Sequence, residues 1–164
     1  MVTRITALET THDVKAFDCG NEDLNTFLRE IASQRQRKFI SKTFVLVDDD
    51  APNEVMGFYT LAVRRMTPRT ELPQAMAKRL PHEVPGLSLA RLAVSDALKG
   101  RHHGEYLLYH ALNKAASAAD EIGGFALFVD AKDAKGADFY KHYGFVPFPD
   151  DPLILFLPFH LVQR

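Results

Sequence analysis

The distribution of apolar positions along the chain predicts six strands. Partly alternating or continuously apolar segments, bounded by turn residues, are typical of strands in a half-buried or buried sheet. Because 43–50 and 54–63 are separated by a short turn, they form a predicted hairpin. Pro158 cannot donate a hydrogen bond within a sheet, so it confines the last strand to an edge or an end. The six strands are expected at 2–9, 43–50, 54–63, 86–94, 125–131 and 152–161.

Helical periodicity and capping residues predict four helices between these strands. Asn21 can cap the first helix, in which Leu24, Phe27, Leu28 and Ile31 form one apolar stripe at helical spacing. A short helix is expected over 71–81, and a long one follows the loop at 95–103 and ends at Gly123 and Gly124. The last helix follows the strand at 125–131 and runs to about Tyr143, with Gly144 at its C-terminal cap.

The order of these elements is β, α, β, β, α, β, α, β, α, β. A hairpin combined with helix-containing crossovers indicates an α/β protein with a mixed sheet. With 164 residues, 46% of them apolar, the chain is long enough for one domain over 1–164. The single cysteine, Cys19, forms no internal disulfide and is expected to be structural.

Targeting and metal signals are weak. Residues 1–13 have no apolar core of a signal peptide, and no stretch approaches the ~20 apolar residues of a membrane span, so a cytoplasmic protein without a membrane partner is expected. Of the seven histidines only His102 and His103 are adjacent, and no ligand spacing surrounds them. No metal is therefore expected.

The charge is unevenly distributed although the net charge is only −1. Residues 64–101 contain eight Lys/Arg against three acids, whereas 120–151 contain three Lys against seven acids. Such asymmetry can create a basic face for a polyanion on a nearly neutral protein. The alternative is ordinary solvated surface charge, which the sequence leaves open.

The segment LARLAVSDALKGRHHGEYLL at 89–108 predicts a strand, a loop and a helix start. A helix N-terminus presents unpaired N–H groups and can bind pyrophosphate. Gly100 and Gly104 would allow close approach of backbone to phosphate, and Lys99 and Arg101 would add positive charge. A purely structural loop would have the same glycines, so this segment alone decides nothing.

A second segment, VDAKDAKGADFYKHYGF at 129–145, predicts a strand and a helix rich in aromatic residues. Core packing is the default role of Phe139, Tyr140, Tyr143 and Phe145.

Four phrases in order resemble the GCN5-related N-acetyltransferase (GNAT) family, and most closely its branch of bacterial type II toxin–antitoxin acetyltransferases. They are FDCGNEDLNTFL at 17–28, LARLAV at 89–94, VDAKD with FYKHYGF between 129 and 145, and PDDPLILFLP at 149–158. The resemblance covers essentially the whole chain. It implies the GNAT fold, with a mixed, mostly antiparallel central sheet and helices on both faces.

The resemblance also implies acetyl-CoA as co-substrate and a set of site residues. Tyr140 would be the general acid that protonates the departing CoA thiolate, since a phenol stays protonated at neutral pH. Leu92, Ala93 and Val94 would bind the pantetheine arm through their backbone, and Phe139 would pack against the cofactor. The pyrophosphate would be wrapped by the loop and helix start, formed by Lys99, Gly100, Arg101, His102, His103, Gly104 and Glu105.

In the resembling toxins the acetylated amine belongs to aminoacyl-tRNA, so that translation stops. The resemblance thus implies aminoacyl-tRNA as substrate, a small antitoxin protein as partner, and a homodimer. Each basic residue proposed for tRNA also has an ordinary reading as solvated surface. The tRNA phosphates would be contacted by Arg91, Arg35, Arg37, Lys38, Arg64, Arg65, Lys78 and Arg79.

The phosphate loop departs from the toxin pattern. Where those toxins usually read like QGxGLG, this chain reads KGRHHG at 99–104, with His102 in place of the central glycine. The Cβ of His102 would crowd the pyrophosphate if the position needs a positive φ, or its imidazole would hydrogen-bond phosphate. A damaged loop would leave a non-catalytic binding protein that keeps the fold. Independently of the loop, an acetyltransferase of a small amine or a protein N-terminus stays open as the other alternative.

Overall fold

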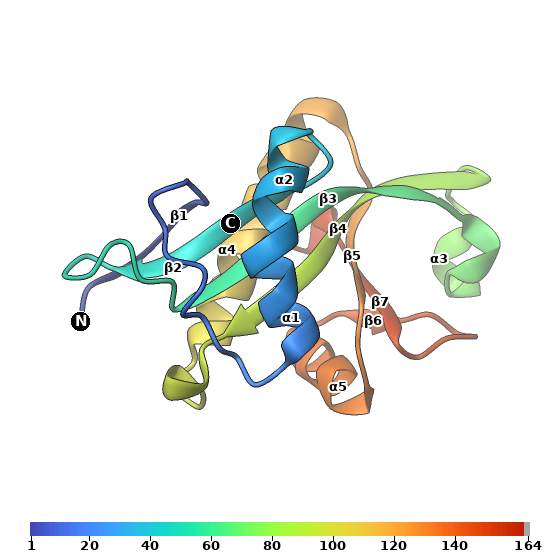
Figure 1. The fold of residues 1–164 in the computed structure, drawn as a ribbon. Coiled ribbons are helices and arrows are strands. Elements are labelled where there is room, and N and C mark those ends of the chain that lie inside the picture. Colours follow the sequence, from blue (N-terminus) through green and yellow to red (C-terminus); the bar gives the residue numbers. More distant parts are fainter. Residues whose placement is uncertain (163–164) are drawn as a thin grey trace. The chain divides into compact units, whose positions relative to one another are not determined.

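A mixed seven-stranded sheet forms the framework of the protein (Figure 1). The computed structural model describes residues 1–162, so the last two residues of the predicted domain lie outside the described part. The order of hydrogen-bonded strands is β1-β2-β3-β4-β5-β7-β6. The strands are β1 (Thr3–Ala7), β2 (Lys42–Asp48), β3 (Gly57–Pro68), β4 (Glu83–Val94), β5 (Ala126–Asp130), β6 (Val146–Pro147) and β7 (Ile154–Pro158).

Within residues 1–162, five α-helices accompany the strands. They are α1 (Glu22–Thr26), α2 (Ala32–Arg37), α3 (Gln74–Ala77), α4 (His103–Ile122) and α5 (Ala134–His142). The pairs β1–β2, β2–β3, β5–β7 and β6–β7 are antiparallel, and β4–β5 is parallel. The predicted α/β class with a mixed, mostly antiparallel sheet is therefore confirmed.

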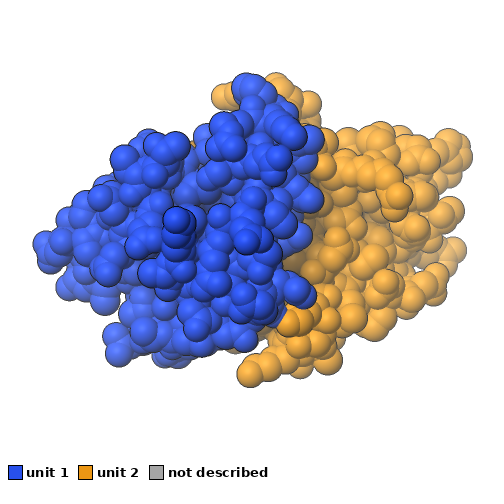
Figure 2. All heavy atoms as spheres, in the orientation of Figure 1, with its two compact units in different colours: residues 1–62, 90–111 blue, residues 63–89, 112–164 orange. Residues whose placement is uncertain are grey.

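The chain forms two compact units, coloured separately in Figure 2. The first contains Met1–Ala62 and Ala90–Ala111, and the second contains Val63–Leu89 and Leu112–Arg164. β3, β4 and α4 each contribute residues to both units.

In the first unit the register of the predicted hairpin sorts its side chains onto two faces. Phe44 pairs with Tyr59 and Val45 with Phe58. Since neighbouring residues of a strand point to opposite faces, each pair faces its own helix layer. The Phe44 and Tyr59 rings stack 5.0 Å apart, and the Tyr59 hydroxyl lies 2.7 Å from Nδ1 of His110 on α4. Val45 and Phe58 join the core under α1 and α2.

The first helix begins where its cap was predicted. The Asn21 side chain accepts a hydrogen bond from the Leu24 amide at 3.1 Å, and a π-helical turn at Phe27–Ile31 continues α1 into α2. Phe27 and Leu28 are buried in the core, and Leu24 and Ile31 pack against it. The predicted apolar stripe is therefore confirmed.

The second unit is built around β5, which lies between β4 and β7. Its core contains Phe128, Phe148 and Phe156, and the Phe128 and Phe156 rings stack 5.8 Å apart. Gly86 on β4 makes room for Phe128, because a Cβ at this position would come within 2.3 Å of the ring.

Several element bounds differ from the sequence-based predictions, and one short strand was not predicted. The helix expected over 71–81 is reduced to α3, because Pro73 is extended, with ψ 134°, and the first helical residue is Gln74. The strand expected at 54–63 is shifted to Gly57–Pro68. β6 was not predicted, since two residues show no periodicity. The expected strand at 152–161 is shorter, with Pro158 as its last residue, and β7 lies inside the sheet between β5 and β6.

Candidate active site

The loop before α4 has the backbone shape of an anion cradle. Gly100 and His102 both adopt left-handed conformations, with φ of 82° and 64°. The His102 carbonyl accepts a hydrogen bond from the Tyr106 amide at 3.1 Å and so closes the first turn of the helix. The amides of the first turn of a 20-residue helix then have no partner within the helix and carry its positive dipole end. Backbone and helix together suit a phosphate ligand.

His102 keeps the loop in this shape without filling it. Its side chain is 85% exposed and its Nδ1 lies 3.3 Å from Oε2 of Glu105. The position thus has a positive φ, the condition under which the His102 Cβ was expected to crowd the pyrophosphate. Because the imidazole points into solvent beside Glu105, the histidine costs backbone strain and leaves the glycine-like conformation intact.

The turn that contains FDCGN supports the phosphate loop, a link that sequence reasoning missed. The Lys99 ammonium donates to the Cys19 carbonyl at 2.6 Å and pairs with Asp96 at 2.9 Å. The Asp96 amide in turn donates to the Asp18 carbonyl at 2.9 Å. Lys99 thus holds the loop against the 17–21 turn, while its side chain remains 55% exposed.

A buried asparagine fixes that turn from inside. Asn25, 2% exposed, accepts from the Cys19 amide at 2.9 Å and donates to Asp18 at 3.0 Å. Hydrogen bonds from the Gly20 amide and from Asn25 lower the pKa of Asp18, so its carboxylate stays charged near neutral pH. The buried thiol of Cys19 contacts the Asn21 carbonyl, which confirms the predicted structural role of Cys19. The only sign of this network in the sequence is the position of Asn25, four residues after the end of the FDCGN phrase at 17–21.

The end of β4 presents the residues predicted for the pantetheine arm. The parallel register with β5 covers Gly86–Ser88, and Leu92–Val94 lie beyond this register in the part of the chain that the structure describes. Ala93 is buried in the core of the first unit, while Leu92 and Val94 are half-buried. A strand segment of this kind can hold an extended ligand by backbone hydrogen bonds.

Tyr140 lies in the second unit, on α5. The Asp133 side chain caps this helix by accepting from the Gly136 amide at 2.8 Å. The Tyr140 ring is buried and packs edge-on against Phe139 at 5.1 Å and Phe145 at 5.4 Å. Burial raises the pKa of the Tyr140 phenol well above its usual value. A phenol in its protonated form keeps the proton that a general acid must donate.

Two of the predicted tRNA-binding arginines converge on one ring in the first unit. The Arg91 guanidinium lies 4.5 Å from the centre of the Phe27 ring, and the Arg35 guanidinium lies 5.9 Å from it. Burial and the neighbouring Arg35 lower the pKa of Arg91, whereas Asp23 opposes this shift. Two like charges held together attract an anion. Lys38, at the C-terminal cap of α2, is exposed.

The predicted basic residues of the second unit differ in how far their side chains are exposed. Arg64 is only 16% exposed, because it pairs with Asp130 at 3.3 Å, contacts Ser88 at 3.1 Å, and lies 4.9 Å from the Phe128 ring centre. Little of its charge is therefore available to a ligand. Arg65, Lys78 and Arg79 are exposed.

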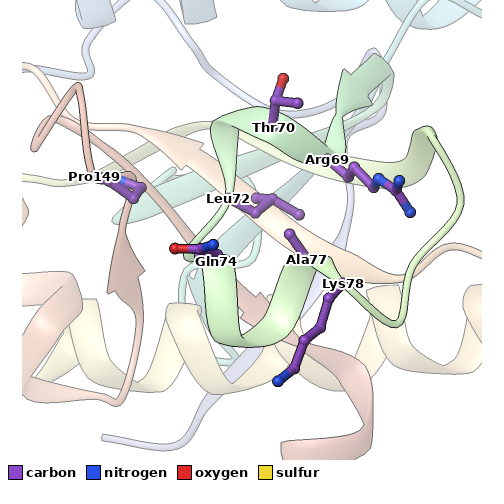
Figure 3. Close-up of a pocket in the computed structure, with 7 residues that line it drawn as sticks. All are labelled: Arg69, Thr70, Leu72, Gln74, Ala77, Lys78 and Pro149. Carbon is purple, nitrogen blue, oxygen red and sulfur yellow. The ribbon is translucent and has the colours of Figure 1, made fainter.

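Lys78 also lines a pocket of about 490 Å³ beside α3 (Figure 3). Arg69 lies at the same pocket and donates to the Leu80 carbonyl at 2.7 Å. The remaining lining residues are Thr70, Leu72, Gln74, Ala77 and Pro149.

Among residues 1–162, no group of three or more His, Cys, Asp and Glu side chains is arranged to hold a metal ion. Within the same residues, no helix combines the length and apolar character needed to cross a membrane.

Residues 10–145 match the family model described as "Acetyltransferase (GNAT) family". The chain belongs to the GNAT acetyltransferase family. It is an acetyl-CoA-dependent N-acetyltransferase with the GNAT fold, as the sequence phrases indicated.

Within this family, the chain is similar to acetyltransferase toxins of known sequence and structure. It is 35% identical over 145 residues to the tRNA-acetylating toxin of Mycobacterium tuberculosis (strain ATCC 25618 / H37Rv), covering 88% of this chain and 85% of the relative. AtaT complexed with acetyl-methionyl-tRNAfMet superimposes with a TM-score of 0.89 at 33% identity, covering 96% of this chain and 95% of that one. A tyrosine-to-phenylalanine variant of the AtaT toxin, bound to the C-terminus of the antitoxin AtaR and acetyl-CoA, gives a TM-score of 0.81 at 31% identity, covering 96% and 94%.

Proposed function

We propose that this GNAT enzyme acetylates the amino group of an amino acid carried on tRNA, and acts as the toxin of a toxin–antitoxin pair. The observation that carries the proposal is the similarity to a tRNA-acetylating toxin over 88% of the chain. The similarity to AtaT in complex with acetyl-methionyl-tRNAfMet supports the same substrate class.

The proposed reaction forms an N–C bond and breaks the thioester C–S bond. The amine attacks as the free base, which favours an aminoacyl α-amino group of pKa ~7.7–8 over a lysine side chain of ~10.4. Its surplus proton passes to water. A backbone N–H among Leu92–Val94 stabilises the oxyanion as charge develops. Tyr140 donates its proton to the departing sulfur and is reprotonated from solvent.

The phosphate loop supports acetyl-CoA as the donor. The residues present fit a pyrophosphate, because Gly100 and His102 open the backbone and the first turn of α4 supplies amide donors. In this proposal Gly100–Glu105 bind the pyrophosphate mainly through the backbone, with Arg101 adding charge. Lys99 acts by positioning the loop, and Phe139 packs against the donor.

The proposed partners follow from the same relatives. AtaT is bound to the C-terminus of the antitoxin AtaR in a solved structure, and we infer a small antitoxin protein for this chain as well. We also propose a homodimer and a cytoplasmic location, where charged tRNA is found.

Acetylation of a small amine or a protein N-terminus is the second candidate. The exposed basic residues Lys38, Arg65, Lys78 and Arg79 argue against it, because a small acceptor needs no such charge. The non-catalytic alternative rested on crowding of the phosphate loop by His102, and the 85% exposed side chain beside Glu105 argues against crowding by the imidazole.

A comparison of acceptors tests the proposal. Purified protein is given labelled acetyl-CoA with aminoacylated bacterial tRNA, with free amino acids, or with peptides that have a free N-terminus. We expect label on aminoacyl-tRNA only, with an apparent KM that rises steeply with salt as phosphate contacts are screened. Transfer to peptides or free amino acids at a comparable kcat/KM would instead support the second candidate.

A further inference from the structure

The C-terminal end of α2 leads into an exposed aromatic residue with an unusual backbone. Phe39 is 96% exposed and has a φ of 60°, and Ile40 beside it is 59% exposed. A left-handed conformation is rare for a bulky aromatic residue. Nearly the whole ring is presented to solvent, where burial does not repay the strain.

Hydrogen bonds fix this conformation. The Phe39 amide donates to the Gln36 carbonyl at 3.2 Å, and the Ile40 amide donates to the Arg35 carbonyl at 2.9 Å. This pair of bonds is the Schellman motif, in which the left-handed position is usually glycine. Glycine at position 39 would adopt this backbone conformation at a lower free-energy cost. The phenylalanine ring is therefore not explained by the capping of α2.

The surrounding charge indicates what the ring faces. Residues 35–42 read RQRKFISK, with four basic residues and no acid. Arg37, Lys38 and Lys42 are all exposed. A basic segment with an exposed aromatic ring is typical of surfaces that bind single-stranded nucleic acid, in which cations contact phosphates and a ring stacks on a base. An apolar protein surface would have to accommodate these cations as well as the ring.

We propose that Phe39 stacks on an unpaired base of the tRNA substrate while Arg37, Lys38 and Lys42 contact the adjacent phosphates. This inference rests on the proposed function and adds a contact with a base to it. Stacking tolerates any base, because every base has a π-face. The contact therefore strengthens tRNA binding without selecting a sequence.

Two substitutions at position 39 separate the ring from the backbone. Phe39→Gly removes the ring and relieves the strained conformation, so it should raise the thermal midpoint while it weakens tRNA binding. The expected loss of affinity is roughly 5- to 150-fold, corresponding to one stacked base. Phe39→Trp keeps an aromatic ring and introduces the sole tryptophan of a chain that has none. Its binding should stay near that of the wild type, and its fluorescence should change on RNA addition.

The test measures binding of the full chain to unfractionated aminoacylated bacterial tRNA, without acetyl-CoA, over a range of salt concentrations. Ile122→Ala, which alters a 78% exposed apolar residue at the end of α4, is the matched control and should bind as the wild type does. Phe39→Gly should leave the salt slope unchanged, whereas Arg37→Ala and Lys38→Ala should each lower it by about 0.7–0.9.

The outcomes separate this inference from the function on which it rests. If the wild type binds tRNA and Phe39→Gly binds equally well, the stacking contact is wrong and the tRNA substrate stands. If Phe39→Gly instead shifts the oligomeric state in sedimentation and leaves RNA binding intact, the ring faces a second copy of the chain. If the wild type itself does not bind tRNA, the proposed function and the inference both fail.

Discussion

At the residue scale, His102 shows how a phosphate loop can tolerate a side chain where glycine is favoured. Its φ of 64° places it in the left-handed region, which costs an L-residue about 1–2 kcal/mol. The strain is compatible with function because the imidazole is exposed and pairs with Glu105. The loop therefore keeps its donors and loses only some stability.

Replacing His102 with glycine should relieve this strain. We expect His102→Gly to stabilise the fold by about 0.5–1 kcal/mol, since the gain from lost strain exceeds the added flexibility of the unfolded chain. The acetyl-CoA dissociation constant should stay the same or fall. Denaturant unfolding and calorimetric titration measure the two effects. A clear loss of acetyl-CoA affinity would instead show that the imidazole binds phosphate itself.

At the element scale, hydrogen bonds and ion pairs between segments distant in sequence position the functional residues. The 17–21 turn holds the phosphate loop through Lys99 and Asp96, and Asn25 holds the turn. In the second unit, β4 and β5 approach closely at Gly86, where a Cβ would meet Phe128 at 2.3 Å and the Ala126 carbonyl at 2.9 Å. Because Gly86 has no side chain, β4, the strand that ends in Leu92–Val94, can pair closely with β5 at this point.

Gly86→Ala should destabilise the fold by about 1–3 kcal/mol, because the added methyl group overpacks a rigid core. The same chemical change at Gly136 is the control. A Cβ there meets nothing closer than 3.4 Å, and the residue lies in a helix, so Gly136→Ala should stabilise by about 0.5–1 kcal/mol. Chemical denaturation of both variants checks the contrast. Equal effects of the two changes would mean that the close approach of Phe128 to Gly86 is wrong.

Sequence patterns predicted those elements whose signal is local. The Asn21 cap, the 24–31 stripe and the glycine end of α4 all depend on residues within a few positions of one another. Contacts between residues far apart in the sequence were not predicted, such as Lys99 with Cys19 or Arg64 with Asp130. Arg64 and Lys99 were predicted to bind ligands, and their partners within the protein are not visible in the sequence. The residue roles at the site came from the family phrases and remain predictions.

At the scale of the whole molecule, the net charge is only −1, although exposed Lys and Arg side chains are present that could bind a polyanion. The structure divides the predicted basic residues into two groups. Arg64 and Arg91 are partly buried, whereas the others are exposed, namely Arg35, Arg37, Lys38, Arg65, Lys78 and Arg79. Electrostatic binding by such residues is independent of the nucleotide sequence of the tRNA.

The measurement that tests the account most directly is the product of a reaction with acetyl-CoA and aminoacylated tRNA. After ribonuclease digestion, mass spectrometry detects the aminoacyl-adenosine with or without an added acetyl group. The wild type and Tyr143→Phe should both give N-acetyl-aminoacyl-adenosine. Tyr140→Phe should remain folded and bind acetyl-CoA, yet lose at least about 100-fold in rate, as expected for a lost general acid. An unmodified amino acid after reaction with the folded wild type, or full activity of Tyr140→Phe, would contradict the account.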